Sequence, residues 1–523
     1  MSAQTPAAGR REWIGLAVIA LPCMLYSMDL TVLNLAVPSI SADLKPSAAQ
    51  LLWIVDIYGF SVAGLLITMG TLGDRIGRRR LLMIGAAAFG IASVLAAFST
   101  SAAMLIAMRA VLGIAGATLA PSTLSLIRNM FHDAHQRSIA VGVWIASYSA
   151  GAAIGPVLGG ALLQYFWWGS VFLVSVPVMV LLLVLAPVLL PEYRDPRAGR
   201  LDLVSAALSM AAVLATIWGI KRLAEHGVAW LPLAAIAAGV CIGYVFLRRQ
   251  TRLSDPMLDP LLFRATTFRA AVAVYALTTF VAFGTFLLIA QYMQLVLGFS
   301  PMLAGLWGLP ISAVFIFGSL TSPWIARRIR PGYVMAGGLL IAAAGFGLLA
   351  RIDATSSVMQ LVTAFIVYSL GLAPVFTLAN DLIIGCAPPE RAGAASAISE
   401  TGSEFGGALG IAILGSVATA IYRGALADKA PPGIAPDVLE ATRSTLGAAV
   451  SVAQSLSEDL RHALVDVARN AFVEGMQVDA GIAAVVAVAT AMAAAVVLGR
   501  HSESGSRAQA RGLSDRASHG LDR

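Results

Sequence analysis

Long apolar runs recur along the whole chain and constrain its fold more than any other feature. Each run holds roughly 20 residues, enough for a helix to cross about 30 Å of hydrocarbon at a rise of 1.5 Å per residue. Only 12% of the 523 residues are charged and 58% are hydrophobic, whereas about a quarter of a soluble domain is charged. The sequence therefore predicts an all-α membrane protein with about 14 transmembrane helices, at 13–37, 50–72, 81–99, 102–126, 138–164, 167–190, 202–220, 229–247, 268–296, 302–325, 333–350, 357–384, 393–422 and 477–499.

Several classes of function are excluded by residue type and position. The formal net charge of +7 comes from basic residues in the short gaps between apolar runs, a pattern typical of membrane topology rather than of a nucleic-acid groove. The three cysteines lie far apart without CxxC spacing, no histidine lies inside an apolar run, and no GxxxxGK[ST] nucleotide loop occurs. We therefore expect no metal, no cofactor, no nucleic-acid partner and no enzyme activity.

The distribution of basic residues predicts the orientation in the membrane. Arginines fill one alternate set of short loops, and the loop at 73–80 alone holds four of them. The opposite set holds only Lys45, Lys221, Arg222 and Arg351. Because Lys and Arg concentrate in the cytoplasmic loops of multi-pass proteins, we expect both termini in the cytoplasm and the chain in the inner (cytoplasmic) membrane.

A repeated loop indicates two halves. The segment from Gly70 to Arg80 and the segment that begins at Ser322 share a small residue, an apolar pair and an arginine cluster, about 250 residues apart. Parallel halves place a substrate site at their interface near the bilayer midplane, although basic loops also arise in multi-pass proteins without a repeat. The expected division is a cytoplasmic N-terminus at 1–12, a six-helix bundle at 13–190, two inserted helices at 191–267, a second six-helix bundle at 268–499 and a cytoplasmic tail at 500–523.

One long polar segment, 423–476, interrupts the second half on the outer side. Ser457 followed by Glu458 and Asp459 predicts a helix start, since acidic residues are favoured at a helix N-terminus. We expect a short helical hairpin there, and a solvated linker is the alternative.

Four motifs lie in order along the first five spans. They read Met28-Asp29-x-Thr31-x-x-Asn34-x-Ala36-x-Pro38, Gly70-x-Leu-x-Asp74-Arg75-x-Gly77-Arg78-Arg79, Arg109-x-x-x-Gly113 and Gly151-x-x-x-Gly155-Pro156-x-x-Gly159-Gly160. With these motifs the chain resembles the major facilitator superfamily, in its branch of 14-span drug:proton antiporters. Acidic residues in spans two and thirteen make it similar to the QacA-like multidrug exporters within that branch. The resemblance implies two six-helix bundles plus two inserted helices, and proton-driven export; Leu112 departs from it, because the family usually has Gln there.

Two of these motifs have a physical interpretation as gates. Asp74 lies among arginines, and a carboxylate there can form a bridge that fastens helix ends in one conformation. The glycines of span five let backbones approach closely, and Pro156 removes one backbone hydrogen bond and permits a bend. Topology alone for the arginines and ordinary helix packing for the glycines are the alternatives.

Five ionisable residues lie inside the predicted spans, where each costs at least ~2.5 kcal/mol and marks function by default. They are Asp29, Asp56, Arg109, Glu400 and Glu404. Arg109 is interpreted as a partner that tunes Asp29. Glu400 and Glu404 share one face of span thirteen, where two like charges one turn apart favour proton carriage.

Each of these acids also has a structural alternative. Asp29 can serve only to orient Arg109, Asp56 can lie in the wet interface, and the two glutamates can form structural bridges. Tyr26, Trp53 and Tyr58 offer π-faces for a quaternary ammonium, although Trp and Tyr also mark membrane interfaces. We favour the interface interpretation for these three aromatic residues.

The sequence favours a drug:proton antiporter that expels lipophilic cationic drugs and antiseptics. Buried carboxylates attract organic cations and carry protons, so its partners are expected to be such cations, protons and the lipid bilayer. We expect a monomer. A dedicated exporter of one endogenous metabolite or antibiotic is the alternative.

Overall fold

The computed structural model describes residues 8–194, 202–253, 256, 262–386, 392–432, 434 and 436–499. The predicted tail at 500–523 and the first seven residues of the predicted N-terminus lie outside this part. Within it, 14 helical segments are long and apolar enough to cross a membrane, which confirms the predicted all-α membrane fold.

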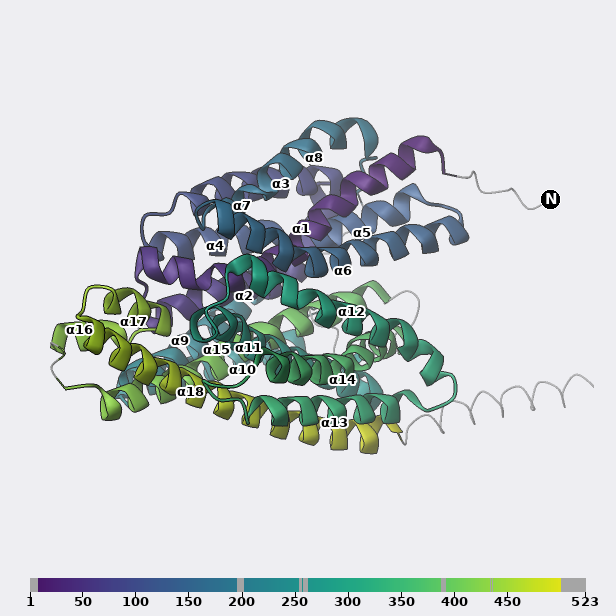
Figure 1. The fold of residues 1–523 in the computed structure, drawn as a ribbon. Coiled ribbons are helices and arrows are strands. Elements are labelled where there is room, and N and C mark those ends of the chain that lie inside the picture. The colour runs from purple at the N-terminus through teal and green to yellow at the C-terminus, as the bar shows by residue number, and fades with distance from the viewer. Residues whose placement is uncertain are drawn as a thin grey trace, which may run out of the picture.

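The first six spans form one bundle, with two of the spans broken (Figure 1). The fourth span breaks at Ala117–Thr118, and the sixth breaks at Val174. The helices are α1 (Arg10–Leu44), α2 (Ala48–Ile76), α3 (Arg78–Ala97), α4 (Ala102–Gly116), α5 (Leu119–Met130), α6 (Ala134–Tyr165), α7 (Ser170–Leu173) and α8 (Ser175–Leu189).

The last six spans form a second bundle with its own hydrophobic core (Figure 1). Its long helices are α11 (Thr266–Gln291, continued by a π-helical turn to Val296), α12 (Pro301–Ala326), α13 (Pro331–Leu349), α14 (Val358–Gly385), α15 (Ala392–Lys429) and α18 (Glu458–Ala493, continued by a π-helical turn to Leu498).

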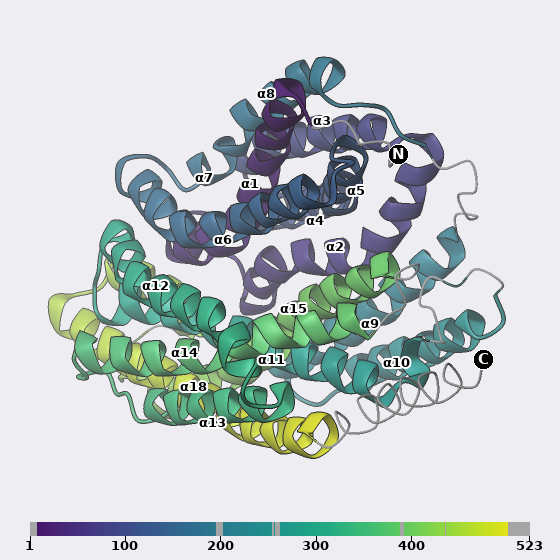
Figure 2. The same cartoon turned by 90° about the vertical axis from the view of Figure 1, so that its right-hand side faces the viewer.

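Two inserted helices complete the fold. They are α9 (Leu203–His226) and α10 (Trp230–Gln250), which pack on each other. Figure 2 shows them beside the second bundle, and α9 also packs against α2 of the first bundle and α15 of the second. The insertion is therefore in direct contact with the interface between the bundles.

Most of the described residues in 423–476 are helical, so the solvated-linker alternative is wrong. Two short helices, α16 (Pro436–Thr442) and α17 (Leu446–Ala453), connect α15 to α18. The helix predicted at Ser457 does begin there, but it is not confined to a hairpin, because α18 runs on through residue 477, the predicted start of the last span. Because no proline interrupts 458–493, α18 continues without a break from its amphipathic first turns into the apolar span.

The two bundles are in close contact toward the face that carries α16 and α17, here called the distal face. A Cβ added at Gly160 of α6 would lie 2.5 Å from the Pro301 carbonyl oxygen of α12, and one at Gly415 of α15 would lie 2.7 Å from the Leu52 side chain of α2. Helix α1 begins and α18 ends at the opposite face (Figure 1). The bundles are thus closed against each other at the distal face.

Candidate functional site

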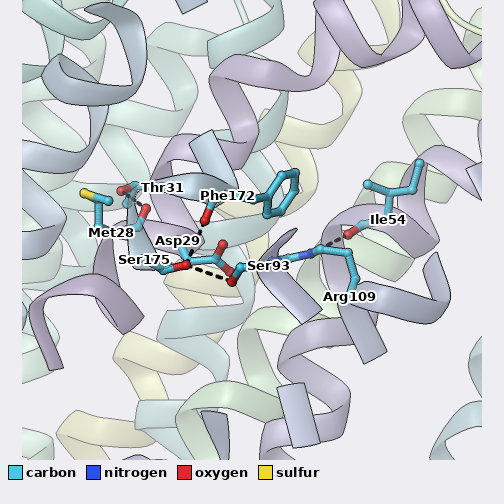
Figure 3. Close-up of polar contacts among 8 residues, drawn as sticks. All are labelled: Met28, Asp29, Thr31, Ile54, Ser93, Arg109, Phe172 and Ser175. Carbon is cyan, nitrogen blue, oxygen red and sulfur yellow. Dashed lines mark hydrogen bonds and ion pairs between the residues drawn. The ribbon is translucent and has the colours of Figure 1, made fainter. Parts of the chain in front are cut away.

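A buried ion pair joins α1 and α4 inside the first bundle. The Arg109 Nη1 atom lies 2.5 Å from Asp29 Oδ2, and the side chains are 1% and 17% exposed. Figure 3 shows the arginine reaching toward Asp29 while its Nε donates to the Ile54 carbonyl oxygen at 3.1 Å. The guanidinium also lies 4.6 Å from the centre of the Tyr58 ring. The structure therefore brings Arg109 and Asp29 together as an ion pair, and the tuning of Asp29 by Arg109 stays a prediction.

Asp29 also borders a small cavity of about 10 Å³, whose lining is mostly apolar apart from Asp29 and two serines. The cavity is lined by Ser93 and Ser175, whose hydroxyls are 2.7 Å apart, and by the Phe172 ring (Figure 3). A space of this size with several polar partners matches a single water molecule. Asp29 therefore pairs with Arg109 and shares this cavity with the two serines.

Asp56 is paired with a lysine from the inserted helix α9. Lys221 Nζ lies 2.8 Å from Oδ2 and 3.0 Å from Oδ1 of Asp56, and both side chains are at most 1% exposed. The ammonium also lies 4.0 Å from the centre of the Trp53 ring. The prediction that Lys221 belongs to an outer loop is wrong, as is the wet-interface alternative for Asp56. The apolar pattern of α9 fades near residue 220, but the helix continues to His226, and Asp56 neutralises the ammonium that is buried in this last part.

Glu404 of α15 faces the first bundle across the interface. The Tyr26 hydroxyl of α1 donates to Glu404 Oε1 at 2.6 Å. Glu404 and Asp56 line one cavity of about 40 Å³, whose other walls come from α2, α11 and α15. Glu400 lies one turn earlier on α15, as the sequence predicted. Carboxylates from both bundles thus meet at the interface.

Aromatic rings surround these carboxylates. Tyr26 contacts Tyr58 and Tyr148 with ring centres 5.9 and 5.8 Å apart, and Tyr148 contacts Trp144 at 4.9 Å. Tyr26 is 6% exposed and Tyr58 is 0% exposed, so the interface-belt interpretation is wrong for these two. The sequence reasoning missed Trp144 and Tyr148. Their spacing of four residues, continued by the glycines of the same helix face, is the signal that indicates them.

The loop motif between α2 and α3 forms a local ion pair. Arg78 Nη2 lies 2.6 Å from Asp74 Oδ1, and Nη1 of the same arginine donates to the Pro121 carbonyl oxygen at 3.2 Å. Gly77 separates the helices with a φ of +114°, a conformation that other L-residues rarely adopt. Arg75 is exposed. A bridge between Asp74 and one arginine is therefore present, as the sequence predicted.

A second carboxylate, which the sequence reasoning missed, completes this junction. Glu192 follows α8 and accepts a hydrogen bond from the Arg79 amide at 3.1 Å. The Arg79 side chain donates to the Leu190 carbonyl oxygen at 2.9 Å. The end of α8 is therefore tied to the α2–α3 loop.

The glycines of α6 allow close approach on two sides of the helix. Gly151, Gly155 and Gly159 pack against α1, where added Cβ atoms would overlap the Met24 carbonyl oxygen, the Thr31 hydroxyl and the Val32 side chain. Gly160 packs against α12 of the other bundle, and the Pro156 carbonyl oxygen contacts Gly305 of that helix. Helix α6 therefore connects the Asp29-bearing helix with the second bundle.

Comparisons with known proteins agree with this architecture. The family model described as Major Facilitator Superfamily matches residues 19–411. The chain is 44% identical over 500 residues to the multidrug efflux pump LfrA of Mycolicibacterium smegmatis, covering 95% of this chain and 98% of that protein. It is 36% identical over 466 residues to the methyl viologen resistance protein SmvA of Salmonella typhimurium, covering 88% and 93%.

Further likenesses extend to an antibiotic exporter and to a solved structure. The tetracenomycin C resistance and export protein of Streptomyces glaucescens is 32% identical over 504 residues, covering 95% of this chain and 93% of that protein. A bacterial homologue of the human lysosomal transporter Spinster, in an inward-facing and unoccupied conformation, has the same fold with a TM-score of 0.63 and 18% identity, covering 93% and 98%. The protein is a multi-pass membrane transporter and belongs to the major facilitator superfamily.

Proposed function

We propose that the protein exports lipophilic cations across the inner (cytoplasmic) membrane in exchange for protons. Export is supported by the relatives, which are named as a multidrug efflux pump and as resistance and export proteins. A cationic substrate is supported by the relative named for resistance to methyl viologen, which is an aromatic dication. The arginine-rich loops support an orientation with both termini in the cytoplasm.

The observation that carries this proposal is the cavity that Asp56 and Glu404 share at the bundle interface. A carboxylate neutralises a cation without demanding a particular hydrogen-bond geometry, and aromatic faces add attraction that tolerates many cation shapes. The Tyr26 hydroxyl donates to Glu404 at 2.6 Å, so an aromatic side chain lies beside that carboxylate. These features fit recognition by charge and apolar area, which is what a multidrug substrate range requires.

Proton coupling follows from competition for the same acids. Glu400 and Glu404 lie one turn apart on α15, so both are costly to ionise together in a low-dielectric site. A cation that binds there favours release of a proton, and a proton that binds favours release of the cation. When the closed distal face opens, protons enter from outside and displace the cation outward.

The gates are assigned to the two motifs that connect helix ends. The Asp74–Arg78 bridge and the Gly155–Pro156 segment lie where helices must shift as the bundles rock. We assign the bundles to 13–190 and 268–499 with the insertion at 191–267, and we expect one chain to carry the complete pathway.

The test uses everted membrane vesicles that hold an acidic interior and a fluorescent pH indicator. Addition of tetraphenylphosphonium, ethidium or methyl viologen is expected to release protons from vesicles that contain the protein. Vesicles without the protein give the baseline, and a neutral lipophilic compound controls for leakage. No proton release with any cation refutes the proposal.

A dedicated antibiotic exporter is the second candidate. It is favoured by the relative named for tetracenomycin C export and by a puromycin resistance protein that is 33% identical over 425 residues. Proton release with a single antibiotic and with none of the simple cations selects this candidate.

A further inference from the structure

The Lys221 ammonium lies where a carboxylate and an aromatic face converge. It lies within 3.0 Å of both Asp56 carboxylate oxygens and 4.0 Å from the centre of the Trp53 ring. A carboxylate with an adjacent π-face is the chemistry that recognises an organic cation. Asp56 and Trp53 therefore form a cation site, and the cation in it is the Lys221 ammonium of the same chain.

The ion pair separates two cavities. On one side is the 40 Å³ interface cavity, which Asp56 shares with Glu404. On the other side is a recess of about 430 Å³ at the distal end of α2 and α9, which has room for a displaced lysine side chain. Its lining residues are Ser47, Ala49, Gln50, Trp53, Trp218, Lys221 and Arg222. Lys221 is 2% exposed and lines this recess, whereas Asp56 lines the interface cavity.

The residue type at position 221 is suited to reversible pairing. Only Lys45, Lys221 and Lys429 are lysines among the 35 lysine and arginine residues. The other two lie at helix ends, at the C-cap of α1 and at the last position of α15. A lysine is a single point charge on a flexible stem, whereas an arginine binds a carboxylate with two fixed hydrogen bonds. The desolvation of both charges also makes a buried pair weak in net terms.

We propose that the Lys221 ammonium occupies the site where the substrate cation binds, and that it competes with exported cations for Asp56 and Trp53. A lipophilic cation that reaches Asp56 displaces the ammonium into the recess between α2 and α9. The inserted helix thereby sets the affinity and the size range of the substrates. This inference rests on the proposed function, since it takes the substrate to be a cation.

Competition of this kind lowers the apparent affinity in proportion to the fraction of sites that the lysine occupies. Removal of the ammonium is therefore expected to tighten cation binding. Its displacement by a substrate is expected to expose the Lys221 amine.

The first experiment follows the amine in the wild-type full-length protein. Reductive methylation with formaldehyde and a borane, read by mass spectrometry, reports each of the three lysines separately. In the free protein Lys221 is expected to react much more slowly than Lys45 and Lys429. Saturating tetraphenylphosphonium, with binding measured by calorimetry on the same sample, is expected to accelerate only Lys221, by roughly threefold or more for a site that is mostly lysine-occupied.

The second experiment compares Lys221→Met with Arg222→Met, a matched change at the next residue. Arg222 lines the same recess, but it stacks on Trp218 and does not lie at Asp56. Lys221→Met is expected to lower the Kd for tetraphenylphosphonium roughly threefold or more, and Arg222→Met to leave it within twofold. Saturable binding to the wild type without faster Lys221 labelling overturns the inference and leaves the proposed function standing, whether or not Lys221→Met folds. An unchanged or higher Kd in folded Lys221→Met also overturns it. Absence of saturable binding by tetraphenylphosphonium, ethidium and methyl viologen overturns both.

Discussion

The ion pair between Asp29 and Arg109 permits a test that separates its structural role from a role in transport. Asp29→Asn leaves the Arg109 charge buried, and Arg109→Met leaves the Asp29 charge in the same apolar surroundings. Removing one partner of a buried pair costs about 3–5 kcal/mol. We expect each change to lower the free energy of unfolding by about 3 kcal/mol, the lower end of that range. In Asp29→Asn the amide oxygen can still accept a hydrogen bond, and in Arg109→Met the remaining Asp29 side chain is 17% exposed.

The double variant Asp29→Asn/Arg109→Met removes both charges. Its free energy of unfolding is expected to lie within about 1 kcal/mol of the wild-type value. Its transport is nevertheless expected to be absent, because we propose that the Asp29 carboxylate takes part in coupling besides pairing with Arg109. Stability is measured by reversible unfolding in mixed detergent micelles, and transport by proton release from everted vesicles. Asp43→Asn is the control, since Asp43 lies on the same helix and accepts a hydrogen bond from the Trp168 indole at 2.6 Å.

Two results refute this reasoning. If the double variant is as unstable as the sum of the single variants, the two charges do not stabilise each other. If the double variant is stable and transports normally, Asp29 is a structural partner of Arg109 and has no part in coupling.

Three further predictions concern the interface and the gates. Glu404→Gln keeps an acceptor for the Tyr26 hydroxyl but cannot ionise, so we expect a narrower cation range or fewer protons released per cation in vesicles; an unchanged range and stoichiometry contradicts the assignment. Gly151→Ala places a methyl group against the Met24 backbone and is expected to cost about 1–3 kcal/mol in unfolding free energy, whereas Gly142→Ala on the same helix meets nothing within 4 Å and serves as the control; equal stabilities would show that α1 and α6 do not pack tightly. Asp74→Asn breaks a partly exposed ion pair, so we expect a stability change of at most about 1 kcal/mol with slower transport; a normal transport rate removes the bridge from the gating mechanism.

The sequence located most of the chemistry but not all of its partners. The sequence indicates Asp29 and Arg109 because a charge inside an apolar run is costly. A residue of opposite charge at a comparable depth lowers that cost. Lys221 follows an apolar run and stands beside Arg222, which predicts a loop, and nothing local distinguishes a buried lysine at a helix end from a solvated one. Tyr26 and Tyr58 have a sequence context that also fits the membrane interface, and their burial depends on contacts with other helices, such as Glu404 of α15 for Tyr26 and Arg109 of α4 for Tyr58.

The sequence by itself determined that the protein lies in a lipid bilayer, and it determined the number of spans, their approximate limits and the family. These properties depend on runs of apolar residues and on short motifs, which are local along the chain. Only the tertiary structure decided that Asp56 pairs with Lys221, that Tyr26 reaches Glu404, and that the helix starting after Ser457 continues without a break into the last span. Those pairings depend on how each helix is rotated and which helix lies beside it. Packing between residues far apart in the chain sets both, and no periodicity within one helix encodes them.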